Sequence, residues 1–136
     1  MKNRVSAVLI RDGKILLIKR VKPDATYYTL PGGTVEEGEE PEVTMAREIL
    51  EELGSGADVK ELLFKIEGKD RKDFYYLVKN FVGEPRLGEP EVSRINPENQ
   101  YIFEWVDMND MSNMDDFYIP FARDELLAWW DKAKDR

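Results

Sequence analysis

The stretch that decides the fold is GTVEEGEEPEVTMAREILEELG, which runs from Gly33 to Gly54. Its first part is rich in glycine and acidic residues, a composition typical of a loop. Pro41 suits the first turn of a helix, and Gly54 suits the position just past a helix end, where glycine tolerates left-handed backbone angles. The stretch therefore predicts a loop followed by a helix over residues 41–53.

One face of this predicted helix carries three carboxylates. At 100° per residue, Glu51 and Glu52 lie within about 60° of Glu48. Like charges at this spacing repel one another by roughly 0.2–0.5 kcal/mol per pair, so a bound cation would relieve them. The aliphatic side chains fall towards the other side, and we expect the helix to bury them: Val43, Met45, Ala46, Ile49, Leu50 and Leu53.

The composition limits the chemistry available to the chain. Its 136 residues, of which 42% are apolar, fit one globular domain, 1–136. The chain has neither cysteine nor histidine, which excludes disulfides and cysteine nucleophiles and disfavours zinc. A general base or metal ligand must therefore come from Asp, Glu, Lys, Tyr or the backbone.

The net charge of −8 is concentrated in one place. Residues 36–52 contain eight glutamates and one arginine, which leaves the remainder nearly neutral. A solvated acidic helix face would account for this, and so would a site for hard cations such as Mg²⁺. No basic cluster predicts a nucleic-acid partner. No stretch approaches the roughly 20 apolar residues of a membrane span or forms a signal peptide, so a cytoplasmic protein is expected.

The rest of the chain predicts a sheet around this helix. Asp12-Gly13 separates two branched-rich runs, a strong hairpin signal. Strands before and after an internal helix, followed by a terminal helix, favour an α/β sandwich with a mixed sheet. The expected strands are 5–10, 14–19, 27–30, 59–66, 74–82 and 101–106, and the terminal helix is 120–134.

The spacing of the charged and glycine residues in the deciding stretch resembles the Nudix box of MutT-like hydrolases. That box is a glycine, five residues, a glutamate, seven residues, then Arg-Glu, two residues, Glu-Glu, one residue and glycine. The final aliphatic position of the box is Ser55 here, which affects local packing rather than the ligands. The matching positions are Gly33, Glu39, Arg47, Glu48, Glu51, Glu52 and Gly54.

The resemblance implies the Nudix α/β/α sandwich with a catalytic loop-helix-loop. It implies that Glu48, Glu51 and Glu52, with the backbone carbonyl of Gly32, hold Mg²⁺ or Mn²⁺. Arg47 would orient the carboxylates, while Glu39 would support the loop. Carboxylate and carbonyl oxygens suit Mg²⁺, and a bound metal lowers the pKa of its water, so no histidine is needed.

The reaction implied is hydrolysis of a nucleoside diphosphate linked to another moiety, a small-molecule nucleotide. Nucleoside triphosphates, including oxidised ones, are one substrate class; ADP-ribose, nucleotide sugars and dinucleoside polyphosphates are others. The alternative is a non-catalytic Nudix-like module that senses a nucleotide, which the intact acidic positions disfavour. A monomer and a homodimer both remain open.

Candidate residues also lie outside the box. In many family members a further glutamate on another loop assists, and residues 84–100 offer Glu89, Glu91 and Glu98, of which we favour Glu91. Lys19 and Arg20, at the end of the second expected strand, would contact either phosphate or solvent. The run 107–116 lacks the glycine and glutamate of a calcium loop and predicts a turn with capping residues. The aromatic residues that would stack a base or fill the core are Tyr27, Tyr28, Phe74, Tyr75 and Tyr76.

Overall fold

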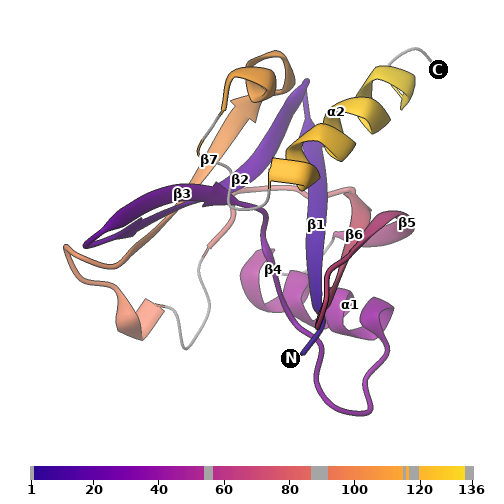
Figure 1. Cartoon of the computed structure of the whole chain (residues 1–136), viewed down its shortest axis with the longest axis horizontal. Helices are drawn as coiled ribbons and strands as arrows, with labels where there is room; N and C mark the ends of the chain where they lie inside the picture. Colours follow the sequence, from indigo (N-terminus) through magenta and orange to yellow (C-terminus); the bar gives the residue numbers. More distant parts are fainter. Residues whose placement is uncertain (1, 54–56, 87–91, 115, 117–119, 134–136) are drawn as a thin grey trace.

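The computed structural model describes residues 2–53, 57–86, 92–114, 116 and 120–133. Within them, strands and helices follow one another along the chain as shown in Figure 1. No helix in these ranges is long and apolar enough to cross a membrane. The elements are β1 (Arg4–Arg11), β2 (Lys14–Lys22), β3 (Ala25–Thr29), β4 (Gly32–Thr34), α1 (Pro41–Leu53), β5 (Asp58–Glu67), β6 (Lys72–Lys79), η1 (Val92–Arg94), β7 (Gln100–Asp107), η2 (Met108–Asn113) and α2 (Pro120–Ala133).

Strand β1 lies at the centre of a mixed sheet and changes partner along its length. One edge of β1 pairs in parallel with β6. The other edge pairs antiparallel with β4 at Arg4–Ser6 and with β2 at Ile10 and Arg11. Strand β2 in turn pairs with both β3 and β7, and β5 lies beyond β6 at the far edge.

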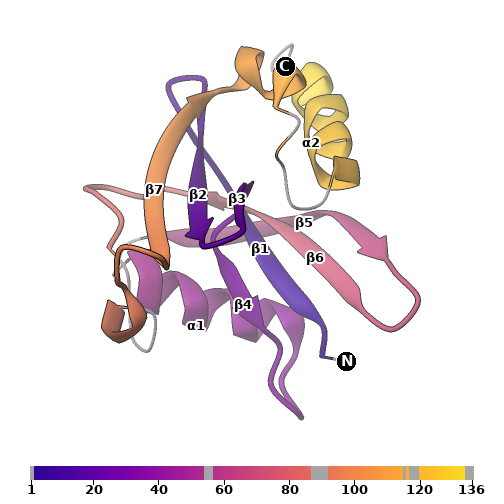
Figure 2. The same ribbon diagram turned by 60° about the vertical axis from the view of Figure 1, so that its left-hand side comes forward.

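The two helices cover opposite faces of this sheet (Figure 2). Alternate residues of β1 contribute to the two cores, because successive side chains of a strand point to opposite faces. Val5, Ala7 and Leu9 pack with Ile49 of α1. Val8 belongs to the other cluster, with Leu126 of α2 and the buried methionines of η2. The predicted α/β/α sandwich with a mixed sheet is confirmed.

Local sequence signals gave most element positions correctly. Helix α1 has the predicted bounds, and Asp12 and Gly13 have φ of 54° and 77°, the left-handed pair that a tight hairpin turn requires. The other predicted strands and the last helix agree to within three residues at each end. Strand β4 was missed, because glycine has low strand propensity and its pairing with β1 is long-range.

The predicted buried face of α1 is right for Met45, Ile49 and Leu53 and wrong for the other three aliphatic residues. Val43 and Leu50 are 56% and 61% exposed, and Ala46 is also exposed. The helix is therefore turned by roughly 100° from the arrangement in which the whole aliphatic side faces inward. Glu48, at one end of the buried arc, therefore lies against Gly33 of β4. The buried residues are Thr44, Met45, Ile49 and Leu53.

Candidate functional site

Two glycines of β4 bring the sheet close to α1. Gly32 and Gly33 pair with Ser6 and Val5 of β1. A Cβ on Gly32 would collide with the carbonyl of Val5, and a Cβ on Gly33 would collide with the carboxylate end of Glu48. Glycine is thus needed at both positions for close approach. The hollow left by the missing side chain of Gly33 holds the Glu48 side chain, of which only 13% is exposed.

Arg47 connects the loop before α1 with the helix carboxylates. Its Nε and Nη2 donate to the two carboxylate oxygens of Glu39 at 3.2 and 3.1 Å, a two-pronged contact. Its Nη1 lies 3.1 Å from Oε1 of Glu48 and 3.5 Å from Oε1 of Glu51. Nη2 also donates to the carbonyl of Thr34, just after the glycines. The predicted orienting role of Arg47 thus has a structural basis in these contacts.

The electrostatics of Glu39 follow from these contacts. Hydrogen bonds from Arg47, and after them one from the Thr44 hydroxyl, lower the pKa of Glu39 to about 2. The same bond to Glu39, aided by the charges of Glu48 and Glu51, raises the pKa of Arg47. Glu39 is therefore an ionised anchor at neutral pH, bonded within the protein.

The three helix glutamates differ in exposure. Glu48 is enclosed beneath Gly33, Glu51 has 47% of its side chain exposed, and Glu52 is half-buried. The three side chains on this face of α1 are therefore not equally exposed to solvent. Among the described residues, no three acidic side chains converge closely enough to hold an ion as they stand. Glu48, Glu51 and Glu52 nevertheless share one side of α1, where Glu48 lies beside Gly33 of β4.

The loop that was expected to supply a further glutamate is only partly described. Glu89 and Glu91 lie outside the described residues, as do Gly54 and Ser55. The backbone N–H of Arg86 donates to the carbonyl of Glu52 at 3.1 Å, so this segment leaves from the end of α1. Glu98 is exposed, in a turn closed by Asn96 and Asn99.

Most of the aromatic candidates for base stacking belong to the interior. Tyr75 is 2% exposed and stacks on Phe64 with ring centroids 4.6 Å apart, and Tyr76 is 8% exposed in the core beneath α1. Phe74 also packs against that core. For these three, the core alternative holds. Tyr28 is half-buried, and its hydroxyl donates to Glu104 at 2.9 Å.

Arg20 fulfils neither of its two expected roles. It is 7% exposed, and it donates to the carbonyl of Gln100 at 2.6 Å and to the Asn99 side chain at 2.9 Å. Its guanidinium also stacks over the Tyr101 ring at 3.5 Å. Arg20 therefore joins β2 to the start of β7.

In the run 107–116, Asp107 caps η2 as predicted.

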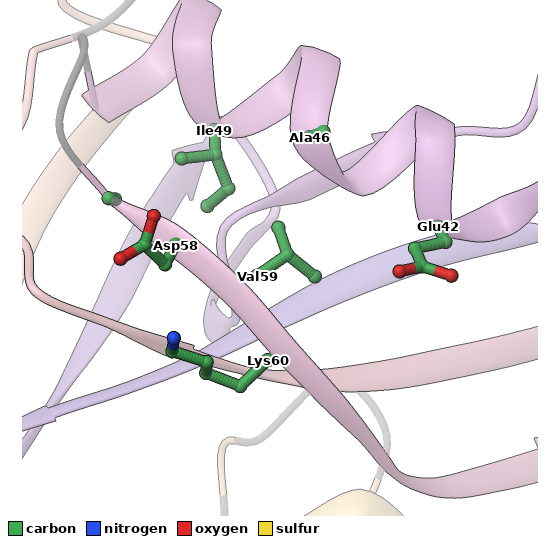
Figure 3. Close-up of a pocket in the computed structure, with 7 residues that line it drawn as sticks. Glu42, Ala46, Ile49, Asp58, Val59 and Lys60 are labelled. Carbon is green, nitrogen blue, oxygen red and sulfur yellow. The ribbon is translucent and has the colours of Figure 1, made fainter.

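A groove elsewhere on α1 is separate from these carboxylates. Figure 3 shows Ala46 and Ile49 of the helix facing Val59 of β5, with charged side chains around them. None of the glutamates at the Nudix-box positions lines it. The residues around it are Glu42, Ala46, Ile49, Ala57, Asp58, Val59 and Lys60.

Comparison with known proteins agrees with this arrangement. The family model described as the NUDIX domain matches residues 1–130. The chain belongs to the Nudix family. This Nudix chain is 38% identical over 90 residues to the 8-oxo-dGTP diphosphatase of Haemophilus influenzae, covering 60% of the chain and 66% of that relative. It is 46% identical over 68 residues to the ADP-ribose pyrophosphatase of Methanocaldococcus jannaschii, covering 49% and 40%.

The Nudix fold extends over more of the chain than these alignments do. A solved MutT structure, from work on the Aliivibrio salmonicida and Vibrio cholerae proteins, superposes with a TM-score of 0.65 at 26% identity. It covers 93% of this chain and 94% of the MutT chain. In sequence, by contrast, the chain aligns with less than two thirds of the length of the two curated relatives.

Proposed function

We propose that this Nudix chain hydrolyses a phosphoanhydride bond in a nucleoside diphosphate linked to another moiety, with the help of Mg²⁺ or Mn²⁺. The observation that carries the proposal is the enclosure of Glu48 between Gly33 and Arg47, with Arg47 held in turn by Glu39. A merely solvated acidic face would need neither the glycine hollow nor the arginine bridge.

The donor set fits a hard divalent cation. Glu48, Glu51, Glu52 and the carbonyl of Gly32 offer only oxygen atoms, which Mg²⁺ and Mn²⁺ prefer. A chain without histidine or cysteine has no softer ligands that would favour zinc. When bound, such ions neutralise charge on the phosphoryl group and lower the pKa of a coordinated water.

The protein's own residues hold these donors in place. Arg47 spreads one positive charge over Glu48 and Glu51, which reduces their mutual repulsion. Glu39 fixes the guanidinium, and β1 fixes the glycine strand. Glu91 is proposed as the further base or ligand, because its segment starts at Arg86, which is bonded to the end of α1.

Nucleoside triphosphates, including oxidised ones, are the first substrate class to test. The relative named 8-oxo-dGTP diphosphatase supports this class, and the relative named ADP-ribose pyrophosphatase supports ADP-ribose as the second class to test. The cytoplasmic location, the single domain over 1–136, the absence of a nucleic-acid partner and the choice between monomer and homodimer stay predictions from sequence.

The test is a panel of nucleotides incubated with Mg²⁺, with phosphate and pyrophosphate release measured for the parent, Glu52→Gln and Glu37→Gln. Glu37 is an exposed loop glutamate and serves as the matched control. We expect Glu52→Gln to lower kcat at least about 100-fold, because losing even a supporting partner of a metal ligand costs up to about this much. We expect Glu37→Gln to leave kcat unchanged. Equal rates for all three would refute the role of Glu52. Nucleotide binding without hydrolysis by the parent would favour the sensing module.

A further inference from the structure

Thr44 is a buried polar residue to which the box spacing assigns no role. Its side chain is fully buried on α1. Its Oγ1 lies 2.6 Å from Oε1 of Glu39 and 3.2 Å from the backbone carbonyl of Glu40. A threonine hydroxyl has one proton to donate, and the shorter, charge-assisted contact is the one to Glu39. We propose that Thr44 is a positioning residue, which sets the Glu39 carboxylate and, through Arg47, the metal-binding glutamates.

The contacts form a continuous chain from the interior to the site. Oε1 of Glu39 accepts from Thr44, from Arg47 and, at 3.2 Å, from the backbone N–H of Glu36. Its Oε2 accepts from Nε of Arg47. Thr44 is the bonded partner of Glu39 that is anchored inside the core, so it fixes the carboxylate relative to the helix. Arg47 then presents Nη1 to Glu48 at 3.1 Å.

The ordinary alternative is a threonine that serves only its own helix. Threonine in a helix commonly bonds back to the carbonyl four residues earlier, which is Glu40 here. In that case the hydroxyl would matter for local stability alone, and Glu39 would keep its position through Arg47. The two interpretations differ in what happens to metal affinity when only the hydroxyl is removed.

The inference rests on the proposed function, and the experiment distinguishes a failure of the Thr44 inference from a failure of the proposed function. Thr44→Val keeps the shape and loses the hydroxyl, whereas Thr44→Ser keeps the hydroxyl and loses a buried methyl. Mn²⁺ affinity is measured by titration calorimetry without nucleotide, alongside kcat, KM and Tm. Val43→Ala, at a neighbouring exposed residue, is the control. A parent that neither binds Mn²⁺ nor hydrolyses nucleotides refutes the proposed function itself.

We expect Thr44→Val to weaken Mn²⁺ binding about 10-fold and to lower kcat by a similar factor, since supporting partners of metal ligands have effects of this size. Thr44→Ser should bind Mn²⁺ within about twofold of the parent, even where its Tm is lower. The inference would be overturned if Thr44→Val bound Mn²⁺ as tightly as the parent. It would also be overturned if Thr44→Val and Thr44→Ser lost the same amount of Mn²⁺ affinity. If Thr44→Val does not fold, Thr44→Ala against Thr44→Ser decides in the same way, because that pair differs only by the hydroxyl.

Discussion

Replacing Gly33 by alanine should mainly reduce activity, whereas replacing Gly32 by alanine should mainly reduce stability. At Gly33 the new methyl group meets Cγ, Cδ and Oε1 of Glu48, the outer part of a flexible side chain. At Gly32 it meets the backbone carbonyl of Val5, which cannot move without opening the pairing of β4 with β1. Gly33→Ala should therefore displace a functional side chain, whereas Gly32→Ala should damage the fold.

The size of each loss in stability depends on whether side-chain or backbone atoms must move. Overpacking costs about 1–3 kcal/mol, and we place Gly33→Ala at the lower end and Gly32→Ala at or above the upper end. For a chain of this length, 1 kcal/mol corresponds to a change in Tm of roughly 4 °C. Gly33→Ala should thus lose about 4 °C and Gly32→Ala about 12 °C or more. Because Glu48 loses its place beside Arg47, Gly33→Ala should also lose about 100-fold in kcat.

Thermal unfolding followed by Trp fluorescence, together with phosphate release at a temperature where all variants are folded, measures both effects. The reasoning fails if Gly33→Ala keeps parental activity, since Glu48 would then not need the hollow. It also fails if Tm falls by the same amount in both variants, because a contact with backbone atoms would then cost no more than a contact with a side chain.

Three further predictions rest on single contacts. Arg47→Lys should lower kcat about 10–100-fold in a phosphate-release assay, because a lysine point charge cannot replace the fork that holds Glu39 and Glu48; parental kcat would show that the fork is dispensable. The pKa of Glu39 is about 2 in the folded chain against a usual 4.5, so its stabilising effect is complete above about pH 4.5 and is lost as the pH falls towards 2. Urea midpoints between pH 6 and 3 should therefore fall less steeply for Glu39→Gln than for the parent, and parallel curves would contradict this. Tyr28→Phe removes the bond to Glu104 and should lower the free energy of unfolding by about 1–2 kcal/mol, with unchanged Mn²⁺ affinity; an unchanged urea midpoint would show that the bond contributes nothing.

The parts of the fold that the sequence could predict depend on neighbouring residues. Helix α1 begins at Pro41 and ends at Leu53, as its sequence predicts, and the Asp12-Gly13 turn is set by two residues with left-handed angles. Such signals act within a few residues, so they can be interpreted without knowing the rest of the chain. The spacing of the glutamates likewise identified the family correctly.

The parts that could not be predicted depend on contacts between distant segments. The helical wheel assumed that Val43 and Leu50 are buried, but β1 and β4 receive the neighbouring side of α1 instead. The bridge from Arg47 to Glu39 spans eight residues across a loop, outside the helical i+3 and i+4 rule. The hydrogen bond from Thr44 to Glu39 likewise joins the helix to the loop before it. No pattern in the sequence indicates this bond.

The change of partner along β1 divides the molecule into two parts that can evolve at different rates. The first residues of β1 hold the glycine strand, while its last residues hold β2, which carries β3 and β7. Strand β7 is joined to the glycine strand through β2 and β1, whereas β3 also continues directly into it through Leu30 and Pro31. Side chains on β7 can therefore change with less effect on Gly32 and Gly33 than side chains on β1, which pairs with both glycines.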